Sequence, residues 1–146
     1  MNLERISTLG PDWAATIDVI ASMLAWSEDF VTINVFTADG NFVTYVQTLL
    51  LENGSFLIEA SGETDPPEII NPSALQILHD LGWQHPTGED FPNFFIVLPT
   101  WEIHEMAAFL VLTLRDVFHI TLDHKYSGVP EEVFNQVIRW KVGNIL

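Results

Sequence analysis

The densest group of side chains that could do chemistry is His119, Asp123 and His124. If the chain from His119 to Asp123 were extended, the side chains of His119 and Asp123 would lie on one face, because side chains alternate along a strand. Two imidazoles and a carboxylate could bind a metal ion or transfer a proton, so a small hydrolase or isomerase is one hypothesis. The spacing fixes no fourth metal ligand, however, and a solvated loop is the favoured interpretation. We therefore assign no catalytic, metal-binding or cofactor-binding residue.

Motifs for common enzyme chemistry are missing from the sequence. It has no glycine-rich phosphate loop, no GxSxG nucleophile elbow and no HExxH pair, so it lacks the signatures of classical nucleotide-binding folds, serine hydrolases and zinc proteases. It also has no cysteine, which excludes disulfides and thiolate nucleophiles and is typical of a protein of the reducing cytosol. No uninterrupted apolar run reaches the ~18 residues that a membrane span needs. Binding is thus favoured over catalysis.

Hydrophobic periodicity predicts a single α+β domain over residues 1–146, with a core at 1–125 and a C-terminal helical extension at 126–146. We expect an antiparallel sheet, built from a three-strand meander and at least one later strand, packed with helices. The order is helix, three strands, helix, strand, helix, helix. The expected elements are a helix at 12–26, strands at about 30–37, 42–51 and 55–60, a helix at 72–81, a strand at 93–98, a helix around 103–117 and a last helix from Pro130. Residues 119–128 are expected to be irregular.

The meander is expected to turn at Asp39-Gly40 and Asn53-Gly54, dipeptides that favour two-residue hairpin loops. Such loops would place Phe36 opposite Val43 and Leu50 opposite Leu57. In that register neither face is clearly polar, so we expect both to be at least partly covered. Helices of this chain could cover one face, and the C-terminal segment, a dimer mate or a peptide could cover the other. The candidate interface residues are Phe30, Phe36, Tyr45, Phe56, Trp101, Phe134 and Trp140.

The charge is strongly negative and unevenly distributed. Twenty Asp and Glu residues against five Lys and Arg residues give a formal net charge of −15, and no basic residue lies between Arg5 and Arg115. Such a surface repels phosphate backbones and anionic lipid, so neither nucleic acid nor membrane is an expected partner, whereas a basic protein or peptide would be attracted. A simpler alternative is that the charge only keeps the protein soluble. Residues 115–146 are balanced in charge, which makes them a candidate for docking onto the acidic body of this chain or of a dimer mate.

Residues 75–118 carry a family resemblance. The segments that carry it are Leu81-Gly82-Trp83, Pro86, Asn93-Phe94, Leu98-Pro99 and Leu114-Arg115-Asp116-Val117-Phe118. With the order of elements, they resemble type III secretion chaperones and their YbjN-like relatives, including Tir-chaperone-like domains. The resemblance implies a small, acidic, non-enzymatic protein, often a homodimer, that holds an extended segment of a partner across its sheet. The expected function is therefore a chaperone-like or adaptor-like module in the cytoplasm that captures a peptide or partner protein on an apolar sheet or helix surface.

Overall fold

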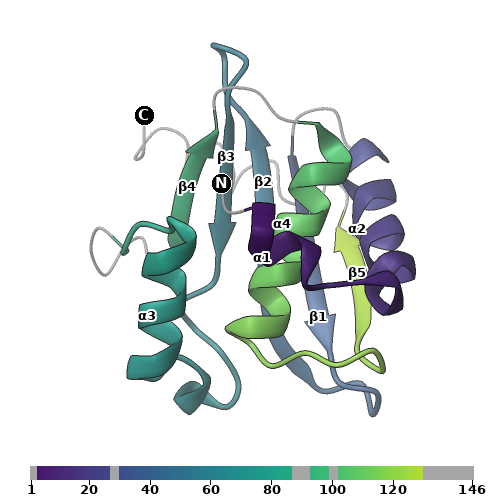
Figure 1. The fold of residues 1–146 in the computed structure, drawn as a ribbon, viewed down its shortest axis with the longest axis vertical. Coiled ribbons are helices and arrows are strands. Elements are labelled where there is room, and N and C mark those ends of the chain that lie inside the picture. Colours follow the sequence, from purple (N-terminus) through teal and green to yellow (C-terminus); the bar gives the residue numbers. More distant parts are fainter. Residues whose placement is uncertain (1–2, 27–29, 87–92, 99–101, 130–146) are drawn as a thin grey trace.

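The structure is a computed structural model that describes residues 3–26, 30–86, 93–98 and 102–129. It has one five-stranded antiparallel sheet in the order β4-β3-β2-β1-β5, with helices packed against it (Figure 1). The predicted α+β class is confirmed. None of the helices within the described ranges has the length and apolar composition to cross a bilayer. The elements are α1 (Leu3–Ser7), η1 (Pro11–Trp13), α2 (Ala14–Trp26), β1 (Phe30–Phe36), β2 (Phe42–Leu50), β3 (Phe56–Ala60), η2 (Pro67–Ile69), α3 (Pro72–Leu81), β4 (Phe94–Leu98), α4 (Ile103–Asp116) and β5 (Lys125–Val129).

Helix α3 begins and ends where its sequence predicts. The side chain of Asn71 accepts a hydrogen bond of 2.9 Å from the backbone N–H of Ala74, and Pro72 takes the first helical position, where its missing N–H costs nothing. Gly82 follows the helix with a φ of 99°, a left-handed conformation that a residue without Cβ adopts readily. These caps fix the direction in which the chain leaves α3 toward Trp83.

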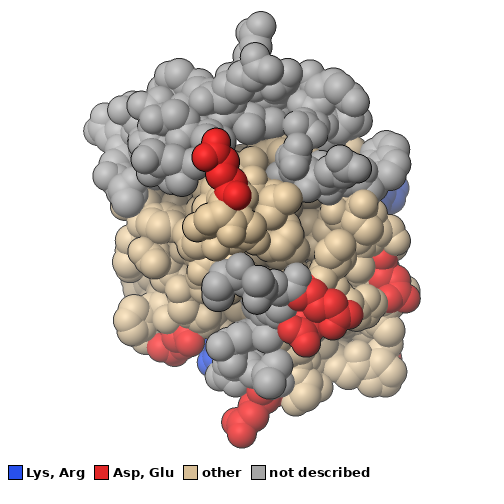
Figure 2. Space-filling model, turned by 90° about the horizontal axis from the view of Figure 1, so that it is seen from above, with Lys and Arg blue, Asp and Glu red and all other residues tan. Residues whose placement is uncertain are grey.

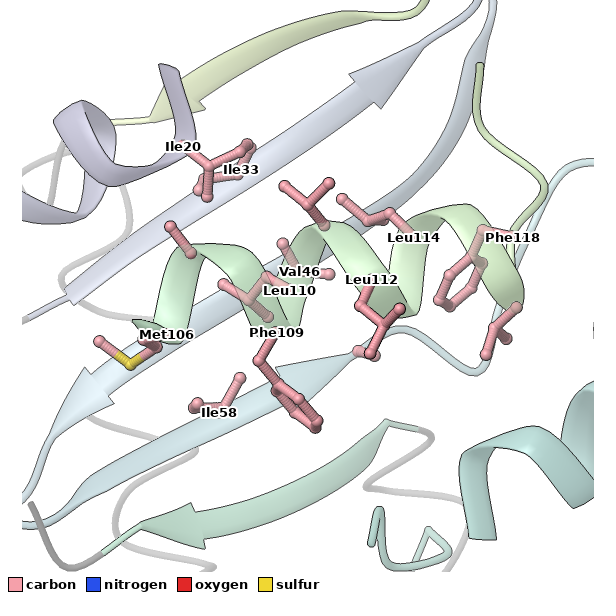
Figure 3. Packing of buried hydrophobic residues seen from close by; sticks show 14 of the residues in the cluster. Ile20, Ile33, Val46, Ile58, Met106, Phe109, Leu110, Leu112, Leu114 and Phe118 are labelled. Carbon is pink, nitrogen blue, oxygen red and sulfur yellow. The ribbon is translucent and has the colours of Figure 1, made fainter. Parts of the chain in front are cut away.

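The buried core lies between the helices and one face of the sheet. Helix α4 is buried along its whole central stretch from Met106 to Leu114, because the sheet lies beneath it and α2 packs alongside. Figure 3 shows its side chains gathered with Ile33, Val46 and Ile58 of the sheet and Ile20 of α2. We call this side, which carries Ile33, Val46 and Ile58, the first face of the sheet.

Trp83 is a core residue, as its position next to α3 predicts. Its ring stacks on Phe109 of α4 with centroids 5.5 Å apart and planes 16° from parallel. Its indole N–H donates a 3.1 Å hydrogen bond to Thr113 Oγ1, so the one polar group of the buried ring is satisfied. The side chain thereby joins the α3–β4 connection to the centre of the longest helix.

The hairpin between β2 and β3 differs from the prediction. Leu51 N–H bonds to Ser55 C=O and Gly54 N–H bonds to Leu51 C=O, at 2.7 and 3.0 Å, which makes a three-residue loop with Gly54 at a φ of 86°. Leu50 therefore faces Phe56, and the predicted pairing of Leu50 with Leu57 is wrong. A shift of one residue turns every side chain of β3 to the other face of the sheet.

The hairpin between β1 and β2 has the same kind of loop, closed by hydrogen bonds between Thr37 and Asn41 and with Gly40 at a φ of 90°. Phe36 consequently faces Phe42 rather than Val43, which corrects the predicted pairing at the end of the strand. An irregularity between Val35 and Phe36 then shifts the register back. Two loops of the same type thus have different consequences, because only the first hairpin contains a compensating bulge.

Strand β5 is an element that the sequence prediction missed. Residues 119–128 were expected to be irregular, yet Lys125–Val129 pairs antiparallel with β1 along the edge of the sheet. Gly128 belongs to this strand, and a Cβ atom there would lie 3.4 Å from Cγ and Sδ of Met23, so the bare backbone leaves room for α2. The helix predicted from Pro130 lies outside the described residues.

Replacing Tyr126 of β5 with phenylalanine is expected to leave the free energy of unfolding unchanged or to raise it by up to about 1 kcal/mol. Its hydroxyl is buried and has no hydrogen-bond partner within the described ranges, so its removal relieves a desolvation cost.

Burial also raises the pKa of Tyr126 from its ordinary value of 10.0 to about 12. Since the folded chain keeps a proton that the unfolded chain loses, stability should fall as the pH rises from 10 to 12. Urea unfolding at pH 9 and pH 11 measures this fall, which should be smaller in the variant; an equal fall in both proteins would contradict the assignment.

Candidate functional site

The candidate site is the side of the sheet opposite the helices, which we call the second face. Figure 1 shows α1, α2 and α4 over the first face, and α3 joins the same core through Leu78 and Leu81. Phe30, Val43 and Leu57 are buried but take no part in that core, because their side chains point to the other side. The second face consists of Phe30, Thr32, Asn34 and Phe36 of β1, Val43, Tyr45, Gln47 and Leu49 of β2, Leu57 and Glu59 of β3, Phe95 and Val97 of β4, and Lys125 and Ser127 of β5.

Strand pairing arranges these side chains in rows that run across the strands. One row is apolar and joins Phe30, Leu49, Leu57 and Val97. The next row joins Thr32, Gln47, Glu59 and Phe95, and a third joins Ser127, Asn34 and Tyr45. Neighbouring rows are two residues apart along each strand, about 6.6–6.8 Å. The face therefore presents an apolar stripe directly beside a polar one.

Two chains of hydrogen bonds converge on the carboxylate of Glu59. In the first, Thr32 Oγ1 donates to Gln47 Oε1 at 3.2 Å, and Gln47 Nε2 donates to Glu59 Oε2. In the second, the hydroxyl of Tyr45 donates to Asn93 Oδ1 at 3.1 Å, and Asn93 Nδ2 donates to Glu59 Oε1 at 3.4 Å. Each amide is thus held by a hydroxyl and presents its N–H to the acid. Such chained hydrogen bonds polarise one another and hold the acceptor in one orientation.

The network is buried although none of the described helices lies on this face. Glu59 is 7% exposed, Gln47 4% and Asn93 3%. The donors to the Glu59 carboxylate are two neutral amides, and no lysine or arginine of the described residues forms an ion pair with it. A buried carboxylate without a cation is costly unless hydrogen bonds or a partner compensate it. Glu59 is therefore the most unusual ionisable group of the second face.

Two large apolar side chains remain open to solvent, one on the edge strand of the second face and one at the start of the central strand β2. Val97 on the edge strand β4 is 47% exposed and ends the apolar row. Phe42, at the start of β2, is 40% exposed and meets Phe36 edge to face, with ring centroids 6.1 Å apart. Single exposed apolar side chains are ordinary on a protein surface, and Val97 matters here because it continues the apolar row to the edge of the sheet.

The predicted interface residues fall into three groups. Phe30, Phe36 and Tyr45 lie on the second face, and the hydroxyl of Tyr45 takes part in the network. Phe56 lies on the first face and packs against the core, because the register of β3 differs from the prediction. The remaining predicted residues, Trp101, Phe134 and Trp140, lie outside the described residues, as does most of the balanced segment 115–146 that was expected to dock.

Sequence reasoning missed four polar members of the network. They are Thr32, Gln47, Glu59 and Asn93. Thr32 and Asn34, at alternate positions of β1, were a usable signal, since they mark one side of that strand, whereas β2 has polar residues on both sides. Glu59 could not be added to them, because the predicted register placed it on the other face.

The residues of the histidine group belong to local turns in the structure. Nδ1 of His124 accepts a 2.9 Å hydrogen bond from the backbone N–H of Thr121, and so closes a local turn. His119 is exposed and follows α4 with a φ of 56°, while Ile120 N–H bonds back to Leu114 C=O to end the helix. Over the described ranges, no three His, Cys, Asp or Glu residues are grouped as metal ligands would be.

A comparison with protein-family models matches residues 8–125 to a known family. The matching family is described as T3SS (YopN, CesT) and YbjN peptide-binding chaperone 3. The match spans every described element from η1 to the end of α4, including the whole of β1 to β4. No curated protein and no solved structure matches the chain.

Proposed function

Because this chain belongs to the T3SS (YopN, CesT) and YbjN peptide-binding chaperone family, which is non-enzymatic, we propose that it holds an extended segment of a partner protein on the second face of its sheet. The family membership confirms the resemblance that residues 75–118 carry. The observation that supports this location is the apolar row from Phe30 to Val97, which lies directly beside the polar network around Glu59. Apolar contacts would supply affinity, and the polar row would supply selectivity.

Binding on the face is favoured over strand addition in the middle of β4. Sheets commonly bind peptides at an exposed edge, where backbone N–H and C=O groups are free. At Phe95, however, both backbone groups are already bonded to Gln84, at 2.8 and 3.1 Å. A strand added there would have to break both bonds first. Contacts with side chains of the second face break no backbone hydrogen bond of the sheet, although a ligand that reaches Leu57 or Glu59 must displace what buries them.

The acidic surface supports a basic partner segment. Residues 6–114 contain no lysine or arginine, so the body of the domain attracts cations and steers basic segments toward it. Figure 2 shows Asp and Glu side chains spread over the end of the molecule seen from above, with little Lys or Arg between them. The proposal places this binding in the cytosol, in keeping with the absence of cysteine.

Replacing Val97 with glutamine is expected to weaken peptide binding about tenfold, because it removes an apolar contact worth roughly 1.5 kcal/mol from the end of the apolar row. The probe is a fluorescein-labelled peptide containing Leu-Ser-Lys-Ser-Leu, titrated by anisotropy at low salt, where charge steering is strongest. Val97 is half exposed, so the substitution should leave folding intact.

Val19→Gln is the matched control for this titration. Val19 lies on α2 with 44% of its surface exposed, nearly the same as Val97, but on the helix side of the molecule. It should bind the peptide as the wild type does. Equal weakening by both substitutions, or by neither, would contradict the location on the second face.

A further inference from the structure

We propose that Glu59 is the specificity-determining residue of the second face and that it pairs with a lysine or arginine side chain of the bound segment. This inference rests on the proposed function and adds the chemistry of the preferred ligand. The carboxylate of Glu59 is buried, and its donors are two neutral amides. A cation supplied by the ligand would compensate the charge far better than an amide does, since hydrogen bonds between ionised groups are the stronger kind.

The carboxylate has both the capacity and the fixed position for such a ligand. An ionised carboxylate offers about four acceptor sites, and the described residues use two, one on each oxygen. Gln47 and Asn93 are themselves held by the hydroxyls of Thr32 and Tyr45. The oxygens are thus oriented before a ligand arrives, which lowers the entropy cost of binding.

The neighbouring row sets where an apolar side chain of the ligand must lie. Leu57 is on the same face, two residues before Glu59, in the row that includes Phe30 and Val97. In an extended peptide, side chains two positions apart are separated by about 6.6–6.8 Å, which is also the distance between the two rows. The preferred segment therefore carries a basic residue with an apolar residue two positions before or after it.

The test compares two labelled peptides on the full-length protein. One contains Leu-Ser-Lys-Ser-Leu, and the other has norleucine in place of the lysine. Norleucine keeps the aliphatic part of the lysine side chain and lacks its charge. Wild type should bind the lysine peptide at least tenfold more tightly. Glu59→Gln should bring the two affinities within about twofold of one another while still binding the norleucine peptide as the wild type does.

Glu63→Gln is the control for the general acidic field. It removes the same unit of charge from an exposed position three residues beyond the end of β3, so it should keep the lysine preference. Equal binding of both peptides by wild type would overturn the role of Glu59 and leave peptide binding itself standing. No binding of either peptide would overturn the proposed function as well.

Two further outcomes would also overturn the inference. If Glu59→Gln keeps both the lysine preference and the stability of the wild type, the preference comes from the acidic field and not from this carboxylate. If that variant is less stable without peptide and its lysine preference is intact, Glu59 serves a cation of the chain itself. Circular dichroism of each variant, together with binding of the norleucine peptide, shows that the second face is still folded.

Discussion

Replacing Phe109 with alanine is expected to lower the free energy of unfolding by about 3–5 kcal/mol, the largest effect of any single substitution considered. The ring is 1% exposed in the middle of α4 and stacks on Trp83. Its removal loses the transfer free energy of the side chain and leaves a cavity beside an indole that is fixed by its hydrogen bond to Thr113. Urea unfolding followed by tryptophan fluorescence measures the change.

Ile103→Ala on the same helix is the control. Ile103 is 36% exposed in the first turn of α4, so its truncation should cost less than about 1 kcal/mol. If Phe109→Ala cost no more than Ile103→Ala, the packing of α4 between the sheet and Trp83 would be refuted.

Replacing Gln47 with leucine is expected to lower the free energy of unfolding by about 2–3 kcal/mol, although it puts an apolar residue in a buried position. Gln47 donates to the carboxylate of Glu59 and accepts from Thr32. Leucine can do neither, so the buried acid loses one of its two amide donors. Chemical denaturation at neutral pH measures the loss.

The double variant Gln47→Leu with Glu59→Leu isolates the interaction. Removing both partners takes away the uncompensated charge, so the double variant should be more stable than Gln47→Leu alone. A double-mutant cycle would then give a coupling of about 1–3 kcal/mol. Additive effects of the two substitutions would show that the network does not hold the second face together.

The ends of most elements could be predicted from the sequence because they are encoded locally. Asn71, Pro72 and Gly82 define α3 through backbone groups within a turn of each residue. The strand ends of the meander were predicted to within a residue or two from the change to β-branched and aromatic residues. Strand β5 escaped because Lys-Tyr-Ser-Gly-Val is a weak strand signal. It forms where β1 offers an edge, and that edge is a property of the whole fold.

The candidate site could be predicted only in part, and the cause is one loop. Asn53-Gly54 was assigned to a two-residue turn, whereas the loop has three residues with Gly54 in the left-handed region. The difference of one residue moved Glu59 to the wrong face and brought Phe56 to the site in its place. Phe30, Phe36 and Tyr45 were placed on the side of the sheet where the structure has them, since the register of β1 and β2 does not depend on that loop. A convergent network over four segments is beyond any single-strand pattern.

The most direct measurement of the central claim is a map of peptide-induced chemical shift changes on the isotope-labelled protein. We expect titration with the Leu-Ser-Lys-Ser-Leu peptide to shift the methyl signals of Leu49, Leu57 and Val97 and the side-chain amides of Gln47 and Asn93. The methyl signals of Val19 on α2 and Ile103 on α4, which are exposed on the helix side, should not move. Changes confined to the second face would support peptide binding there, and changes confined to α2 and α4 would contradict it.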